Sequence, residues 1–352
     1  MSRARDFADL AGSADAGGLT GRNLIINGAM QVAQRGTSST GVHTSGYYTC
    51  DRYEIVYSNE DELRQTITQA SDGPDGFANS LKIQTTTAES AIASDERSYV
   101  IYRAEGQDLQ QLSYGSSAAK KITLSFYVKS SVTGTYAVSV YQADGNDVIG
   151  STYTINSADT WERKTITFPG NTAASIADDN TAGLAFYWGI FFGSDYTSVD
   201  NSAWGEYAAN RFFYGHAQNG VATTTNATWQ LTGVQLEVGE QATPFEHRSY
   251  ADELRRCQRY YYGISTASLL GRLVAPDGNP NDFNGSINFP VSMRTAPSLN
   301  DLTATESGTG SALGGIVSSD VQRDCITFIR MTDDGASDRR GLDVKGFVDA
   351  EL

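Results

Sequence analysis

The chain has 352 residues, a length that suggests two or three compact units. Its formal net charge of −15 argues against nucleic-acid binding, because phosphates would be repelled and no basic stripe is present to release counterions. Gly, Ser, Thr and Tyr are plentiful while Leu, Lys and Met are scarce, so the composition favours an all-β fold.

Residues 1–21 form a separate opening segment. An apolar stripe with helical spacing precedes a Gly- and Ala-rich stretch, and it consists of Ala4, Phe7, Ala8 and Ala11. One short helix is not stable alone, so this stripe needs a partner. A docking contact with another protein and a frayed chain end are the two interpretations left open.

The chain shows no signal for export or membrane insertion. Its opening segment lacks the apolar core of a secretory signal, and no stretch approaches about 18 consecutive apolar residues. The cysteines are widely separated and odd in number, which favours neither a disulfide framework nor a zinc site; they are Cys50, Cys257 and Cys325. We therefore expect synthesis in the cytoplasm without a signal peptide.

Short β-type runs broken by turn signals follow the opening segment. Apolar and polar residues alternate over 122–128 and again over 136–140, beyond a Thr-Gly turn. We interpret these two runs as a hairpin with one face turned inward. If Thr123 pairs with Tyr141, the outward rings of Tyr127 and Tyr141 lie roughly 13 Å apart along the strands.

Two later runs indicate how the sheets are built. Residues 184–192 are apolar on both parities, as in a strand that is covered on both faces, and we place this strand at the centre of a sandwich. Between Trp229 and Val238 the apolar residues change parity at Gly233. A β-bulge at this glycine explains the change.

The pattern changes again at Pro244. Ser249 is a suitable helix N-cap, and several arginines follow where the helix dipole favours cations. This predicts a linking helix within residues 244–260. Residues 261–352 are predicted to form a smaller C-terminal β domain, because turn signals separate its β-type runs. The predicted strands lie at 257–264, 285–291, 325–331 and 342–349. A flexible loop is predicted at 308–315.

The acidic and histidine residues do not form a recognised catalytic pattern. The histidines have no metal-ligand spacing, and we expect structural roles for them; they are His43, His216 and His247. Glycoside hydrolysis needs two converging carboxyl groups, which a sequence cannot show. Two acidic loops, 59–62 and 144–147, offer hard oxygen ligands for structural calcium, although solvated turns are the preferred reading and no cofactor is expected.

Aromatic residues are the remaining candidates for a binding surface. The outward Tyr127 and Tyr141, and the aromatic loop residues of 194–214, suit stacking on sugar rings. The alternative is that these rings pack under loops or against a neighbouring subunit. The candidate glycan-binding residues are Tyr127, Tyr141, Tyr196, Trp204 and Tyr207.

Several phrases resemble a family of phage tail-fibre and virion-appendage proteins. GRNLIINGAMQVAQRGTS and YYTCDRY are similar to the start of its main domain, LTGVQLEVGEQATPFEHRSYADELRRCQRYYY to the close, and FPVSMRTAP and VDAEL to its C-terminal module. The resemblance implies a jelly-roll β-sandwich over residues 22–243, like those of carbohydrate-binding modules, and homotrimeric assembly on the virion. The matching residues look architectural: Asn23, Asn27 and Gly28 suit turn contacts, and Gln235 and Glu237 alternate outward.

Three functions are compatible with these observations. The first is a non-enzymatic tail-fibre-like subunit that docks on other virion proteins through its opening segment and recognises a host surface polysaccharide or another receptor. The second is a purely structural virion component, such as a capsid decoration or adaptor protein. The third is a depolymerase of capsule or lipopolysaccharide.

Overall fold

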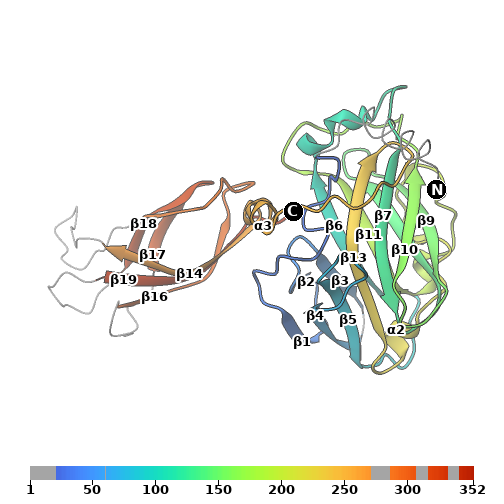
Figure 1. Cartoon of the computed structure of the whole chain (residues 1–352), viewed down its shortest axis with the longest axis horizontal. Coiled ribbons are helices and arrows are strands. Elements are labelled where there is room, and N and C mark those ends of the chain that lie inside the picture. Colours follow the sequence, from blue (N-terminus) through green and yellow to red (C-terminus); the bar gives the residue numbers. More distant parts are fainter. Residues whose placement is uncertain (1–20, 60, 271–285, 307–315, 332–340) are drawn as a thin grey trace. The chain divides into compact units, whose positions relative to one another are not determined.

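The computed structural model describes residues 21–59, 61–270, 286–306, 316–331 and 341–352. Two compact units divide at Tyr250 and Ala251 (Figure 1). The predicted docking residues Ala4, Phe7, Ala8 and Ala11 lie outside the described residues, as does the predicted loop at 308–315.

The first unit is a sandwich of two antiparallel sheets. Sheet A has the strand order β1 (Ser38–Val42), β4 (Arg64–Ala70), β5 (Ser80–Thr87), β13 (Thr228–Val238), β7 (Ile122–Ser130) and β10 (Glu162–Phe168). Sheet B has the order β12 (Gly205–Glu206), β9 (Asp147–Ile155), β8 (Gly134–Gln142), β11 (Ala182–Phe192), β6 (Arg97–Glu105), β3 (Glu54–Ser58) and β2 (Gly46–Tyr47). This confirms the prediction of an all-β chain with a jelly-roll sandwich.

Short helical turns connect these strands. They are η1 (Gly106–Asp108), η2 (Gln110–Leu112), η3 (Ser194–Tyr196), η4 (Ala209–Arg211) and α2 (Gly220–Thr223). No helix among the described residues is long and apolar enough to cross a membrane.

The core lies between the two sheets and is rich in aromatic rings. Alternation along each strand turns one set of side chains inward, so Phe126 of β7 meets Trp188 of β11 at 6.0 Å and Tyr153 of β9 at 5.2 Å between ring centroids. Each such buried ring contributes about 2–3 kcal/mol through removal of apolar surface from water. The sandwich is therefore held by its aromatic interior.

The predicted hairpin over residues 122–140 is wrong. Strand β7 pairs with β10 and β13 in sheet A, whereas β8 pairs with β9 and β11 in sheet B. The intervening turn carries the chain from one sheet to the other, and both strands alternate because each sheet has its own inner face. Tyr127 and Tyr141 thus lie on opposite outer faces of the sandwich.

The predicted bulge in β13 is confirmed. The pairing of β13 with β7 shifts register between Thr232 and Gln235, and Gly233 has a positive φ of 61°. A Cβ atom on Gly233 would lie 2.8 Å from Cδ2 of Tyr127 and 2.9 Å from Cζ of Phe77. Glycine is required here for both its backbone conformation and its lack of a side chain.

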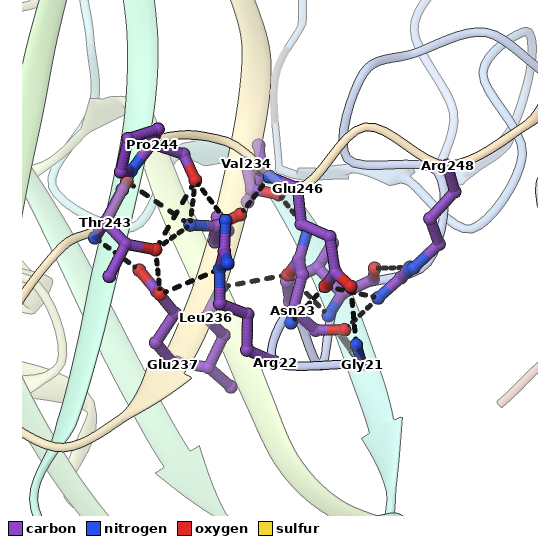
Figure 2. A network of polar contacts seen from close by, with 12 residues as sticks. Gly21, Arg22, Asn23, Val234, Leu236, Glu237, Thr243, Pro244, Glu246 and Arg248 are labelled. Carbon is purple, nitrogen blue, oxygen red and sulfur yellow. Dashed lines mark hydrogen bonds and ion pairs between the residues drawn. The ribbon is translucent and has the colours of Figure 1, made fainter. Parts of the chain in front are cut away.

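Asn23 fastens the start of the sandwich to β13. Its Oδ1 accepts hydrogen bonds from the backbone N–H groups of Ile25 at 3.0 Å and Leu236 at 3.1 Å, and its Nδ2 donates to the carbonyl of Val234 at 3.2 Å (Figure 2). This buried amide satisfies three backbone groups, which confirms the turn role predicted for it.

Residues 243–248, which we call the strap, complete this corner of the sandwich. Glu246 accepts hydrogen bonds from the N–H groups of Gly21 and Asn23, and Arg248 donates to the carbonyl of Asn23 (Figure 2). Partial burial works to raise the pKa of Glu246, but those N–H groups and the nearby Arg248 hold it below its usual range. The strap therefore belongs with the sandwich.

The strap also covers part of the outer face of β13. Gln235 and Glu237 point away from the core, as predicted, yet both are buried. Oε1 of Gln235 accepts from the N–H of Glu246 at 2.7 Å, and Oε2 of Glu237 accepts from the N–H of Thr243 at 2.9 Å. Their polar groups are satisfied by the strap instead of by water.

The second unit opens with the predicted linking helix, α3 (Tyr250–Gln258). Its strands form two three-stranded antiparallel sheets, ordered β14 (Tyr261–Leu270), β19 (Gly341–Asp349), β16 (Ser298–Glu306) and β15 (Ser286–Asn288), β18 (Cys325–Met331), β17 (Ile316–Val321). The strand predicted at 257–264 begins later, because the helix continues to Gln258, and β16 and β17 were not predicted.

Candidate functional site

A long loop, residues 194–214, lies across part of the outer face of sheet B. Its Phe212 and Phe213 are buried against Ala137, Ala185 and Tyr187 of the sheet. Ser139 of β8 donates a hydrogen bond to the carbonyl of Phe212. The loop therefore supplies a second small core outside the sandwich.

Small residues on the sheet make room for this loop. A Cβ atom on Gly150 of β9 would lie 2.2 Å from Nδ2 of Asn201 in the loop. Ala137 of β8 and Ala185 of β11 are further small residues on the outer face that pack in the same cluster as Phe212 and Phe213. Strand β11 is thus covered on both faces and central in its sheet, as its continuous apolar sequence predicted.

Beside the loop, sheet B presents a group of tyrosines with an arginine and a glutamate. We call this group the tyrosine patch; it consists of Tyr99 and Arg103 of β6, Tyr141 of β8, Tyr187 of β11, Tyr207 beyond β12 and Glu54 of β3. Cross-strand pairing sets their positions, since Tyr141 and Arg103 both pair with Ala185, and Tyr187 and Glu54 both pair with Ile101. Residues that are paired directly across neighbouring strands point to the same side of a sheet, so these side chains lie on one face of sheet B.

The rings of the patch are held by contacts with Phe212 of the loop. Its centroid lies 4.7 Å from that of Tyr187, 5.2 Å from Tyr207 and 6.5 Å from Tyr99, each in an edge-to-face arrangement. Tyr99 and Tyr187 are 5.3 Å apart, and Tyr141 and Tyr207 are 5.8 Å apart. Such packing fixes the ring orientations before any ligand arrives.

The charged pair of the patch is partly exposed. Nη1 of Arg103 lies 2.6 Å from Oε2 of Glu54 and donates to the hydroxyl of Tyr47 at 3.2 Å. Burial favours the neutral form of Arg103, but Tyr47 and Glu54 outweigh it and raise the pKa of the guanidinium. The guanidinium of Arg103 therefore keeps its charge beside the Glu54 side chain.

Three tyrosine hydroxyls of the patch, those of Tyr99, Tyr187 and Tyr207, make no hydrogen bond with the described residues. Burial raises the pKa of Tyr187, and the nearby Tyr99 raises it further while Arg103 lowers it. Burial likewise raises the pKa of Tyr99 and of Tyr141. Tyr99, Tyr141 and Tyr187 are therefore neutral at pH 7, and a tyrosine hydroxyl can both donate and accept.

The structure brings together Tyr141 and Tyr207 of the predicted glycan-binding residues. Tyr196 is 8% exposed, its hydroxyl donates to the carbonyl of Asp95 at 2.9 Å, and Arg97 stacks on its ring at 4.7 Å. It belongs to the small core beneath the loop. Because its ring is buried and lies under Arg97, Tyr196 is not placed to stack on a sugar.

The other two predicted residues lie away from the patch. Trp204 donates through Nε1 to the carbonyl of Pro169 at 2.6 Å and meets the ring of Tyr114 at 6.0 Å. Tyr127 lies on sheet A, where its ring is 5.3 Å from Phe77. The five residues thus do not form one surface.

In the predicted acidic loop 59–62, Glu60 lies outside the described residues, and the N–H of Glu62 donates to Oε2 of Glu89 at 3.1 Å. The aspartates of the loop 144–147 are bonded to a neighbouring segment. Oδ2 of Asp144 accepts from the N–H of Ala177 at 2.9 Å, and Oδ2 of Asp147 accepts from Asn171 at 2.7 Å. Within the described ranges, no group of three or more His, Cys, Asp or Glu side chains is arranged to hold a metal ion.

Of the histidines, His216 is buried, and its Nδ1 accepts from the N–H of Ala137 at 3.1 Å. His247 is exposed and packs against Phe77 and Phe245 at 5.2 and 4.9 Å. His43 is exposed. The contacts of His216 and His247 agree with the structural roles expected for them.

Sequence reasoning missed Tyr99, Tyr187, Arg103 and Glu54. A signal was present in β6, where Tyr99, Ile101 and Arg103 alternate with the inward Val100 and Tyr102. That alternation marks outward side chains but does not show which strands lie beside them. The patch depends on pairing among strands that are distant in sequence.

No protein-family model and no curated protein matches the chain. Among solved structures, it is similar to the enzymatically active domain of bacteriophage CBA120 tailspike protein 4, with 10% identity and a TM-score of 0.34 over 62% of this chain and 21% of that one. An MgGH51 arabinofuranosidase shows 13% identity and a TM-score of 0.35 over 71% and 31%, respectively.

The family 11 carbohydrate-binding module of cellulase Lic26A-Cel5E from Clostridium thermocellum shows 12% identity and a TM-score of 0.28 over 62% of this chain and 97% of the module. The chain spans less than a third of the tailspike and arabinofuranosidase chains. At these scores the similarity assigns neither a ligand nor an activity to this protein.

Proposed function

We propose that this protein is a non-enzymatic appendage subunit of a phage particle and that it binds a bacterial surface glycan through the tyrosine patch. The observation that carries the glycan proposal is the patch itself: fixed tyrosine rings with open hydroxyls beside an ion pair, on strands of one sheet and on the loop next to them. Attachment to the virion and trimeric assembly rest on the sequence resemblance.

The chemistry of the patch suits a carbohydrate. Sugar rings combine apolar C–H faces, which pack on aromatic rings, with many hydroxyl groups that both donate and accept hydrogen bonds. The open hydroxyls of Tyr99, Tyr187 and Tyr207 provide both donors and acceptors. Strand positions keep these groups preorganised, which lowers the entropic cost of binding.

The proposal of a non-enzymatic role rests on the small number of carboxyl groups in the tyrosine patch. Retaining and inverting glycosidases use two carboxyl groups across the scissile bond. The patch as defined contains a single carboxylate, Glu54, and it is paired with Arg103 at 2.6 Å. This arrangement suits binding better than proton transfer.

Binding and cleavage are tested with purified protein and a panel of bacterial surface polysaccharides. We expect retention on at least one polysaccharide with no new reducing ends. New reducing ends would instead support the depolymerase function. An absence of retention on every polysaccharide would favour the purely structural role and contradict the proposal.

Substitutions locate the binding surface. Tyr187→Phe keeps the ring contact with Phe212 and removes one open hydroxyl, so we expect binding about fivefold weaker, the worth of one hydrogen bond of about 1 kcal/mol. The melting temperature should change little. Tyr127→Ala, on the opposite sheet, is the control and should bind like the wild type. Equal losses from both variants would place the site elsewhere.

A further inference from the structure

We infer that the glycan bound by the tyrosine patch presents a neutral sugar with two adjacent hydroxyls to Arg103 and Glu54, and that this unit is not a uronic acid or another anionic sugar. This inference rests on the proposed function and specifies the chemical class of the ligand. It follows from the open atoms of the ion pair and from the charge around it.

The ion pair engages one nitrogen atom of Arg103 and one oxygen atom of Glu54. Arg103 makes its contacts with Glu54 and Tyr47 through Nη1, and neither its Nη2 nor its Nε has a partner among the described residues. The contact of Glu54 with Arg103 is through Oε2, and Oε1 likewise has none. The side chains are 23% and 18% exposed. Donors and an acceptor therefore stand next to each other at the surface.

A pair of neighbouring sugar hydroxyls matches these open atoms. One hydroxyl oxygen accepts from the free N–H groups of Arg103, and the adjacent hydroxyl donates to Oε1 of Glu54. A ligand carboxylate could use the arginine, but it has no proton to give to Glu54 at pH 7. The two partners together thus select a diol.

Charge balance disfavours an anionic sugar at this position. Arg103 is already neutralised by Glu54 at 2.6 Å, so an incoming carboxylate would meet a like charge beside its partner. Arg35, which stacks on Tyr47, is likewise 4.0 Å from Asp51. The net charge of −15 on the whole chain adds to the repulsion.

Arg97 lies on the same face of β6, but its surroundings do not offer a second anion site. Its guanidinium covers the Tyr196 ring at 4.7 Å, and its Nε is buried. That end of the strand is acidic: Glu96 is buried and interacts electrostatically with Glu89, Asp61 and Asp95. An anionic ligand would be repelled there as well.

The inference is tested with matched polysaccharides. Each bacterial polysaccharide in the panel is offered intact, after reduction of its carboxyl groups to alcohols, and after mild periodate oxidation, which cleaves adjacent diols. We expect carboxyl reduction to leave binding within about twofold and periodate to weaken it at least tenfold. Raising the salt from about 50 to about 500 mM should change affinity less than twofold, since no net ion pairing is involved.

Loss of binding on carboxyl reduction, or a steep fall with salt, would overturn the inference while leaving glycan binding intact. Failure to bind any intact polysaccharide would instead overturn the proposed function, and this inference with it. The two failures are therefore distinguishable.

The variant Glu54→Gln separates the two ligand classes further. It leaves Arg103 with an uncompensated charge and removes the carboxylate acceptor, so we expect neutral glycans to bind at least fivefold more weakly and uronate-containing ones to gain affinity. Tighter binding of the wild-type ligand to this variant would overturn the inference. Asp72→Asn, which removes the ion-pair partner of Lys129 on sheet A, is the matched control and should leave binding unchanged.

Discussion

His216 shows how burial of one residue makes the fold sensitive to acid. Its Nδ1 accepts from the N–H of Ala137, and its Nε2 lies 2.6 Å from the carbonyl of Gln218. Burial disfavours the charged imidazolium and lowers the pKa of His216 to about 4. The ring is therefore neutral in the folded protein at pH 7.

Stability should fall as the pH drops from about 6.5 to about 4, because in this window the unfolded chain binds a proton at His216 that the folded chain does not. The loss should reach at most about 3 kcal/mol and level off below that window. Denaturant unfolding at pH 7 and pH 5 measures it. His216→Gln should be less stable at pH 7 but should lack this part of the pH dependence; an unchanged dependence would contradict the assignment.

Individual residues of the patch were only partly accessible to prediction. Parity along a strand correctly turned Tyr141 outward, and the aromatic content of the loop pointed to Tyr207. Alternation also turned Arg103 outward, but no local signal showed that it meets Glu54, because this contact depends on β6 pairing with β3, some 49 residues earlier in the chain. Whether two such residues meet depends on which strands pair and in which register, and the sequence of one strand alone does not determine this.

At the scale of the element, the bulge of β13 makes the sharpest prediction. Gly233→Ala should destabilise the protein by about 2–4 kcal/mol, because it adds a strained backbone conformation and a clash with Tyr127 and Phe77. Gly41→Ala is the control, since Gly41 also has a positive φ, 68°, but no atom lies within 4 Å of the added Cβ. It should cost about 1 kcal/mol.

Denaturant titration of both variants measures the two costs. A loss at Gly233 no larger than that at Gly41 would show that the rings above the bulge move aside without penalty.

Strands were easier to predict than their partners. Alternation located β7 and β8 but suggested a hairpin, because a strand in either sheet has one inward face and gives the same pattern. The strands β16 and β17 were missed since their sequences, SLNDLTATE and IVSSDV, contain few large apolar residues. The bulge in β13 was predicted correctly because the change in parity and the glycine that cause it lie in one short stretch of sequence.

At the scale of the whole molecule, the division at Tyr250 predicts that the first unit folds by itself. A fragment of residues 1–250 should unfold in one cooperative transition. A fragment of residues 1–242 lacks the strap, including Glu246 and Arg248, and leaves Gln235 and Glu237 without their partners. It should be less stable by several kcal/mol.

Circular dichroism melting of the two fragments compares them. Equal midpoints would show that the strap is dispensable, and failure of the longer fragment to fold would show that the first unit depends on residues after 250.

The corner formed by Asn23 and the strap has a mechanical consequence. Gly21, the first residue that the structure describes, and Arg248, near the end of the first unit, are bonded to each other through Glu246 (Figure 2). A pull between residues 21 and 248 therefore loads these few bonds and does not stretch the β-sheets. Tension on the polypeptide would bypass the face that carries the tyrosine patch, so a ligand held there would not be released by deformation of its own binding surface.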